Sequence, residues 1–384
     1  MFRTALFWLH LAAGLIAGLV IALLCATGAV LAFEKELIAW AERDARRISA
    51  PPAGAARLTL GEMQAAFRAA QPATRPIPIV VQNDPHAAVG FVTSATAAHY
   101  VDPHTGAVRA PASFAMSRFM HTTVELHRFI GLSGSESRPR GKWVTGVANL
   151  AFFILAVTGL WLWMPRTWSW RAVRPAIWFR QNNTSKARDF NWHNTIGFWC
   201  APVLIVLTLT AMPISFRWAG ELIYTITGTP LPATGPQSGG SPPPPVASVL
   251  APASGAPHVA PDALLAHAQR LIPTWQTITL RLPASGAVQP ATLIVRDRAA
   301  RPRTALITLQ YDPFTGGLLR RDGYEQLNAA RQVRAWNRFL HTGEVFGWWA
   351  QALAGLACVG GCFLVCTGFA LSWRRFFGRA KSED

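Results

Sequence analysis

The sequence predicts a membrane protein in which a bundle of four transmembrane helices carries two periplasmic α+β domains and the whole plan is internally duplicated. Three observations predict this class. The 384-residue chain is 51% hydrophobic, and motifs of its first half recur in its second half. Four apolar segments, near 5–33, 143–164, 192–216 and 347–373, reach the roughly 20 residues that cross a hydrocarbon core.

The order of elements follows from composition along the chain. The first apolar run is far longer than the core of a signal peptide, so we interpret it as a retained anchor. The predicted elements are a first transmembrane helix (1–36), a first α+β domain (37–111), an amphipathic outer helix with the second span (112–165), a basic linker (166–190), a third span (191–218), a second α+β domain (219–325) with a Pro/Gly-rich insert (228–261), and a final outer helix, fourth span and basic tail (326–384).

The two α+β domains share a pattern. The first begins with TLGEMQAAFRAA, in which Thr59 and Glu62 form a capping box, and ends in YVDPHTGAV. The second begins with PDALLAHAQRL and ends in YDPFTGGL. Asp-Pro followed by Thr-Gly predicts a turn between strands. Because the same turn closes both domains, the sequence indicates internal duplication.

The spans also repeat. His10 is followed by a glycine after four residues and a threonine after seventeen, and so is His193. The stretch RFMHT (118–122) resembles RFLHT (338–342), and a Thr-Gly pair occurs in both the second and the fourth spans.

The net charge of +17 would suggest a nucleic-acid partner in a soluble protein. Here it is better explained by topology, because the basic linker and the basic tail belong on the cytoplasmic side under the positive-inside rule. We therefore expect a multi-pass protein of the bacterial inner membrane, with both termini cytoplasmic, the lipid bilayer as partner and no nucleic acid.

Five of the ten histidines flank or enter the spans. His10 and His193 lie near the predicted cytoplasmic face, whereas His121, His127 and His341 lie near the outer face. Two imidazoles that face each other in a helix bundle can hold a haem iron from both sides. The chain has no C-x-x-C-H sequence, so a non-covalent b-type haem is expected at each face.

Other interpretations stay open. An intramembrane histidine can simply bind a carbonyl, and proton or metal transport is another use of such residues. Cys358, Cys362 and Cys366 could hold a metal, although a packing face of small residues is favoured. The remaining His86, His99, His104, His258 and His267 are expected to be solvated.

No nucleotide-binding glycine motif occurs, so no flavin or NAD(P) site is expected, and electrons would come from quinol or a separate reductase.

The stretches HLAAGL…ATGAVLAF, LHR at 126–128, WHNTIGFW and FLHTGEVFG, with the two turns, resemble the PepSY-associated transmembrane proteins over nearly the whole chain. The arrangement is most similar to the siderophore-iron reductases of that family. The resemblance implies two PepSY-like periplasmic domains, two haem b groups in the bundle, and reduction of Fe(III) bound to a siderophore, with a hydroxamate type expected. Oxygen ligands hold Fe(II) less tightly than Fe(III), so one electron would release the metal.

The resemblance also implies the ligands. His10 and His193 would bind the cytoplasmic-side haem, and His127 and His341 the periplasmic-side haem. His121 is the alternative to His127, because the repeated RF.HT stretch pairs His121 with His341 whereas LHR favours His127. A PepSY-based sensor that binds peptides or regulates a protease, without redox activity, is the alternative function.

Overall fold

The computed structural model describes residues 1–48, 54–72, 78–94, 97–165, 167–181, 184–232, 246–250, 256–284 and 287–377. The chain divides into two compact units. A helical unit comprises Met1–Glu34, Thr122–Gly240 and Trp336–Asp384, and a sheet unit comprises Lys35–His121 and Ser241–Ala335.

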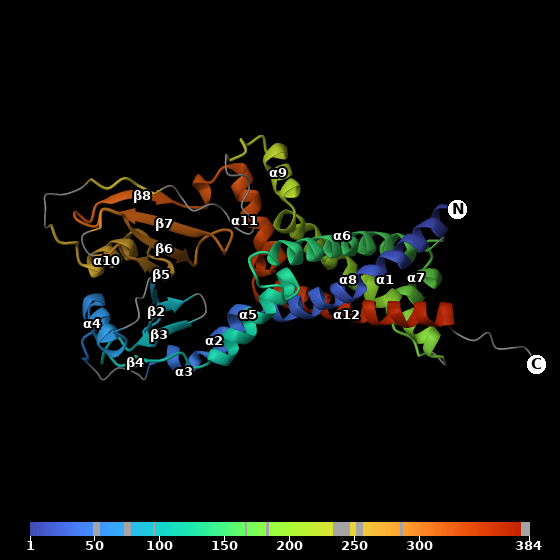
Figure 1. Ribbon diagram of the computed structural model, residues 1–384, viewed down its shortest axis with the longest axis horizontal. Coiled ribbons are helices and arrows are strands. Elements are labelled where there is room, and N and C mark those ends of the chain that lie inside the picture. Colours follow the sequence, from blue (N-terminus) through green and yellow to red (C-terminus); the bar gives the residue numbers. More distant parts are fainter. Residues whose placement is uncertain are drawn as a thin grey trace, which may run out of the picture. The chain divides into compact units, whose positions relative to one another are not determined.

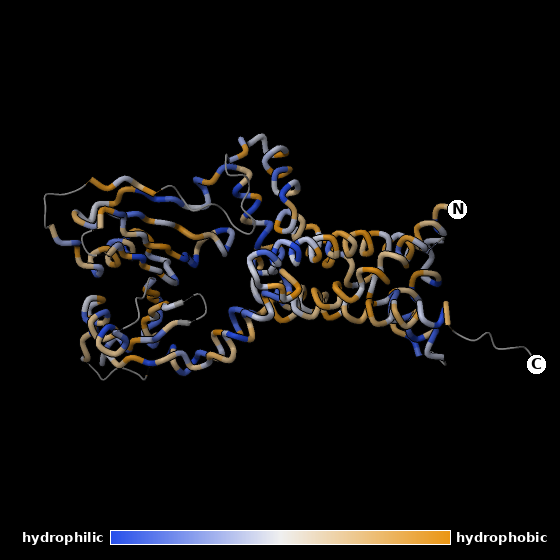
Figure 2. The backbone as a smooth tube through the Cα atoms, viewed as in Figure 1, coloured by the Kyte–Doolittle hydropathy of each residue, from blue (hydrophilic) through white to orange (hydrophobic). Residues whose placement is uncertain are grey.

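The helical unit contains four helices that are long and apolar enough to cross a membrane: α1 (Phe2–Leu31), α6 (Arg138–Trp163), α8 (Ser185–Ser215) and α12 (Trp348–Phe377). Their tubes are mostly orange, the colour of hydrophobic residues, in Figure 2. The sequence predicts these four spans, but α6 and α8 begin earlier than their apolar segments. Helix α8 begins earlier because Thr184 accepts a hydrogen bond from the backbone N–H of Ala187 and caps it among polar residues.

Close helix contacts hold the bundle together. Helix α1 packs on α6 and α12, and α8 packs on the same two helices. A Cβ atom added to Gly360 would lie 2.4 Å from Cys200 Sγ, and one added to Gly361 would lie 2.5 Å from Cys25 Sγ. Only glycine fits these two positions, so the cysteines and glycines form the small-residue packing surface that brings membrane helices together.

Shorter helices flank the bundle. They are α5 (Phe114–Phe129), α7 (Trp170–Ile177), α9 (Arg217–Ile226), α11 (Ala329–His341) and the 3₁₀ turn η2 (Glu344–Phe346). The first residue of α1 and the last residue of α12 lie at the same end of the bundle (Figure 1). The last residues of α5 and α11 belong to the helical unit, and the earlier residues of both helices belong to the sheet unit.

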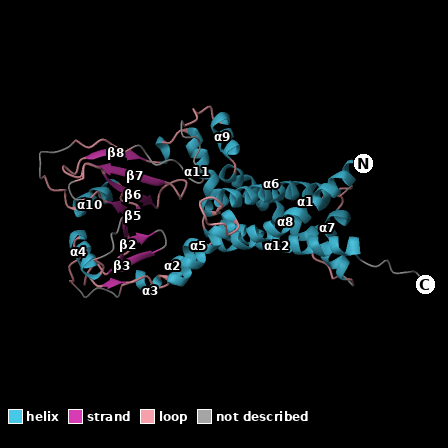
Figure 3. Ribbon diagram, in the orientation of Figure 1, coloured by secondary structure: helices cyan, strands magenta, loops and turns pink. Residues whose placement is uncertain are grey.

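The sheet unit holds one antiparallel sheet of eight strands in the order β4-β3-β2-β1-β5-β6-β7-β8 (Figure 3). The strands are β1 (Pro78–Gln82), β2 (Val89–Ser94), β3 (Ala97–Val101), β4 (Val108–Arg109), β5 (Trp275–Arg281), β6 (Ala291–Asp297), β7 (Leu306–Tyr311) and β8 (Leu318–Asp322). The two α+β regions that the sequence predicts as separate domains therefore share one sheet, because β1 pairs with β5. This pairing satisfies backbone groups that each four-stranded half would leave exposed at an edge.

Helices α4 (Leu60–Ala70) and α10 (Pro261–Leu271) pack on this sheet around a single hydrophobic core. Phe67 from the first half and Tyr311 from the second are both fully buried in that core. The predicted capping box of Thr59 and Glu62 is confirmed at the start of α4. The remaining short helices are α2 (Glu34–Ala41), α3 (Arg43–Arg46) and η1 (Tyr324–Gln326).

The two predicted turns are confirmed. Asp102 Oδ1 accepts from the backbone N–H of His104 at 2.9 Å, and Asp312 Oδ1 accepts from that of Phe314 at 2.8 Å. Each turn ends in a glycine with positive φ, +74° and +71°. In the predicted insert 228–261, residues 233–245 and 251–255 lie outside the described residues, as does the basic tail after residue 377.

The prediction that the other five histidines are solvated is wrong for most of them. His86 is exposed, whereas the other four are half-buried. His99 packs edge-on against Phe67, and His267 Nδ1 forms a 3.0 Å hydrogen bond with the Tyr311 hydroxyl. Burial of that tyrosine raises its pKa to about 12. These rings are part of the packing of the sheet unit.

Candidate functional site

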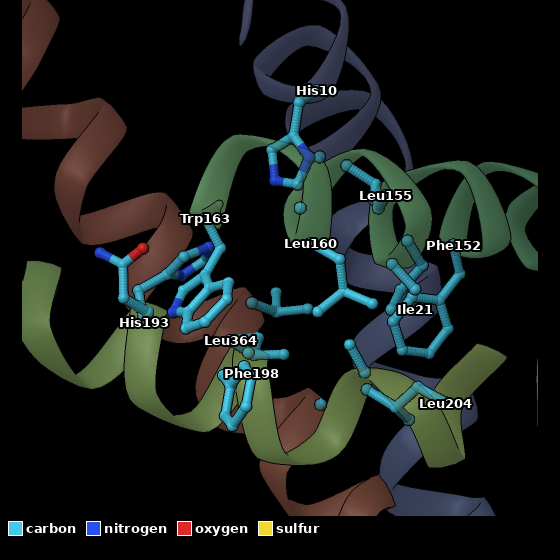
Figure 4. A pocket seen from close by; sticks show the side chains of 18 of the residues that line it. His10, Ile21, Phe152, Leu155, Leu160, Trp163, His193, Phe198, Leu204 and Leu364 are labelled. Atoms are coloured by element: carbon cyan, nitrogen blue, oxygen red, sulfur yellow. The ribbon is translucent and has the colours of Figure 1, made fainter. Parts of the chain in front are cut away.

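His10 on α1 and His193 on α8 line the same pocket in the helical unit, and we call them the first imidazole pair. The pocket encloses about 750 Å³ of empty volume, including space open to the outside. Its walls are largely apolar, and Figure 4 shows both rings among the side chains of Phe152, Leu204 and Leu364. Apolar walls with a few polar groups are typical of cofactor sites.

His127 on α5 and His341 on α11 form the second imidazole pair. Their ring centres are 6.5 Å apart, and the ring planes are inclined by 47°. Both rings lie next to the C-terminal halves of α1 and α8, because His127 contacts Thr27 and His341 contacts Leu207 and Thr210. The structure thus brings together His127 and His341, as the LHR motif favours.

His121 occupies a different position. It lies six residues before His127 on α5, which is about 600° of helical rotation, so the two rings leave the helix on different sides. Its side chain is exposed. His121 therefore has no place in the second pair.

Each of the four paired rings is held through Nδ1. The bonds join His10 to Thr158 Oγ1 at 2.9 Å, His193 to Thr367 Oγ1 at 2.9 Å, His127 to Thr27 Oγ1 at 2.8 Å, and His341 to the carbonyl of Leu207 at 2.9 Å and to Thr210 Oγ1 at 3.3 Å. All of these bonds use Nδ1, so within the described part of the chain they leave Nε2 available.

The threonines determine which ring nitrogen carries the proton. The hydroxyl of Thr158 donates its single proton to the carbonyl of Ile154, at 2.7 Å, in its own helix. The other three threonines make the same bond to a carbonyl four residues earlier, at 2.6 to 2.8 Å. Each hydroxyl can therefore only accept from the imidazole, and the carbonyl of Leu207 is an acceptor by nature. We infer that all four rings carry the proton on Nδ1 and a lone pair on Nε2.

A glycine follows three of the four threonines and lets the ring lie against the helix. A Cβ atom at Gly159 would lie 3.3 Å from His10 Cε1, and one at Gly28 or Gly368 would lie 3.4 or 3.5 Å from its imidazole. The fourth threonine, Thr210, is followed by Ala211, and its bond to His341 is the longest of the four. The Leu207 carbonyl, at 2.9 Å, is the nearer acceptor of His341 Nδ1.

The second pair is neutral at pH 7. Burial, the neighbouring ring of His341 and the positive charge of Arg128 lower the pKa of His127 to about 4. Burial also lowers the pKa of His341. Neutral rings with a lone pair on Nε2 are the form of imidazole that binds metals.

The two pairs lie toward opposite ends of the bundle. On α1, seventeen residues separate His10, in the first pair, from Thr27, which holds the second pair. That separation corresponds to about 25 Å of helix rise. On α8 the same spacing separates His193 from Thr210. The repeated offset in the sequence therefore places two equivalent sites at two depths.

Two facing imidazoles supply only two ligands, and no group of three or more His, Cys, Asp or Glu among the described residues could hold a bare metal ion. A porphyrin supplies the other four ligands of an iron that two imidazoles hold from opposite sides. Bonds between imidazole and a metal ion are about 2 Å long, so the ring centres of two such ligands lie about 6 Å apart. The 6.5 Å separation of His127 and His341 fits this arrangement.

Sequence reasoning missed the role of the threonines. The repeated Thr-Gly pairs and the offset of seventeen are visible in the sequence, but we interpret them there only as signs of duplication. A ligand imidazole usually donates its other N–H to a fixed acceptor, and this is the signal that would have identified them.

Comparison with known protein families gives one result. The family described as the PepSY-associated TM region matches residues 7–375. No curated protein matches the chain.

Proposed function

Because the chain belongs to the PepSY-associated transmembrane family, we propose that it is an inner-membrane reductase that binds two b-type haems and passes electrons across the bilayer. One observation carries the proposal: four imidazoles in two pairs are each held through Nδ1 and present Nε2. Isolated structural histidines would not need this shared arrangement in matched positions of the two halves.

The chain's own residues would do three things. His10 and His193 would hold one haem, and His127 and His341 the other. The threonines orient the rings and strengthen them as ligands through the Nδ1 bond. The apolar side chains that line the first pocket would keep water away from the cofactor. Bound in this way, each haem would supply one-electron chemistry through its iron, and two of them would connect the two membrane faces.

The direction of transfer rests on charge and on family resemblance. Charge supports a cytoplasmic position for one end of the bundle, because α12 ends in Arg374 and Arg375 and the stretch between α6 and α8 is basic, as the positive-inside rule expects of cytoplasmic segments. The family resemblance supports a periplasmic position for the sheet unit. Quinol or a separate reductase is the proposed donor, and siderophore-bound Fe(III), of the hydroxamate class, is the proposed acceptor. The matching histidines and threonines of the two halves support internal duplication.

The test uses purified protein in detergent. After reduction by dithionite and removal of the excess, we expect b-type absorbance bands that disappear when ferric hydroxamate siderophore is added without oxygen, while a chelator traps Fe(II). The double variant His193→Ala/His341→Ala, which lacks one ligand of each pair, should release no Fe(II). A colourless wild-type protein would refute the proposal and favour a peptide-binding sensor.

A further inference from the structure

A group of positive side chains lies beside the second imidazole pair, where α5 ends and α6 begins. Arg128 directly follows His127, and its guanidinium lies 5.2 Å from the centre of the Phe129 ring. The guanidinium of Arg138 lies 4.8 Å from the centre of the same ring. Lys142 is near enough to Arg128 for the two charges to repel. Three cations from two helices therefore share one small region.

Backbone contacts fix this region. The hydroxyl of Thr145 donates to the carbonyls of both Arg128 and Lys142, at 3.0 and 3.1 Å. A Cβ atom added to Gly141 would lie 2.2 Å from the carbonyl oxygen of Phe129, so only glycine permits the contact between the end of α5 and α6. The positions from which Arg128 and Lys142 extend are therefore set by the fold.

Two of these cations share one carboxylate. Glu125 is the carboxylate whose charge acts on Arg128, and it already forms an ion pair with Arg138. Like charges held together repel, so a bound anion would stabilise the group.

The position of the cations indicates which anion. Haem is apolar except for two ionised carboxylate side chains on one edge. A haem held by His127 and His341 would have to keep those carboxylates out of the apolar spans, and Arg128 is adjacent in sequence to one of these ligands. Arginine and lysine form strong charge-assisted hydrogen bonds with carboxylates.

We propose that Arg128 and Lys142 form a carboxylate-binding site that holds the two carboxylate side chains of the haem at the second imidazole pair. This inference rests on the proposed function. It assigns two positioning residues that fix the rotation of the macrocycle about the axis joining the two imidazoles.

The experiment compares haem with its dimethyl ester, in which both carboxylates are neutral. Apo-protein in detergent is titrated with each compound and followed by absorbance, for wild type and for Arg128→Gln/Lys142→Gln. Arg140→Gln is the matched control, because Arg140 is an exposed arginine of α6, the helix that carries Lys142. In all proteins the first imidazole pair should fill equally, which verifies folding.

At one of the two sites, wild type and Arg140→Gln should bind haem about tenfold or more tightly than they bind the ester. This ratio of affinities corresponds to the free energy of one charge-assisted hydrogen bond. The double variant should bind both compounds equally at that site. If it keeps the wild-type preference for haem, the proposal is overturned. If wild type binds neither compound, the proposed function itself fails.

Discussion

Replacing Thr158 with valine should weaken haem binding at the first imidazole pair. Valine keeps the shape of threonine but removes the hydroxyl that accepts from His10 Nδ1 at 2.9 Å. This bond is the one measured on the His10 ring, whereas His341 has a backbone carbonyl as a second acceptor. The substitution therefore leaves an N–H donor without its acceptor inside the bundle.

The magnitude follows from that lost bond. A buried donor without an acceptor costs about 1–3 kcal/mol. Loss of the hydrogen bond that orients a ligand imidazole typically lowers metal affinity by about 10–100-fold, which is the same range of free energy. The ring also becomes a poorer electron donor to Fe(III), so the midpoint potential of the first haem should rise.

Titration of apo-protein with haem, followed by a potentiometric titration, measures both effects. Thr208→Val is the matched control, because Thr208 is a buried threonine of α8 whose hydroxyl donates to the Leu204 carbonyl at 2.7 Å and holds no imidazole. If Thr158→Val and Thr208→Val bind haem with the same affinity and potential as each other, the inferred role of the threonines is wrong.

Three further predictions concern the pocket, the helix contacts and the sheet unit. Gly197→Leu should abolish uptake of the first haem and keep the second, because Gly197 lines the pocket and a larger side chain would fill it; retention of two haems in the absorbance spectrum would contradict this. Asp189→Asn should destabilise the protein by about 1–2 kcal/mol, since this carboxylate binds Arg374 and so joins α8 to α12; an unchanged melting temperature would contradict it. Hydrogen bonds from Thr59 lower the pKa of Glu62, so the stabilisation of α4 should be present above about pH 4.3 and lost as the pH falls further. Hydrogen exchange of α4 amides should then show a difference between wild type and Glu62→Gln that disappears at low pH.

The four spans and the histidine pairs follow from the sequence because their signals are local. Length and apolarity identify a span, and an imidazole near its end is conspicuous. The choice between His121 and His127 is different, since helical rotation shows only that the two rings point to different sides of α5. Which side faces His341 depends on how α5 packs against the bundle, and no local sequence pattern specifies that packing.

The single sheet could not be predicted for a similar reason. Each half has its own turn, helix and strands, so each looks complete in the sequence. The pairing of Val80 with Thr279 joins strands that are almost two hundred residues apart. Strand edges pair wherever geometry allows, and alternating apolar patterns do not specify the neighbour.

The number of haems in purified histidine variants tests the central claim most directly. Wild type and His121→Ala should each contain two b-type haems per chain. Substitution of His10 or His193 by alanine should remove one haem, and substitution of His127 or His341 should remove the other, with a different set of absorbance bands lost in each case. Two haems remaining in all four of these variants, or no haem in the wild type, would contradict the account.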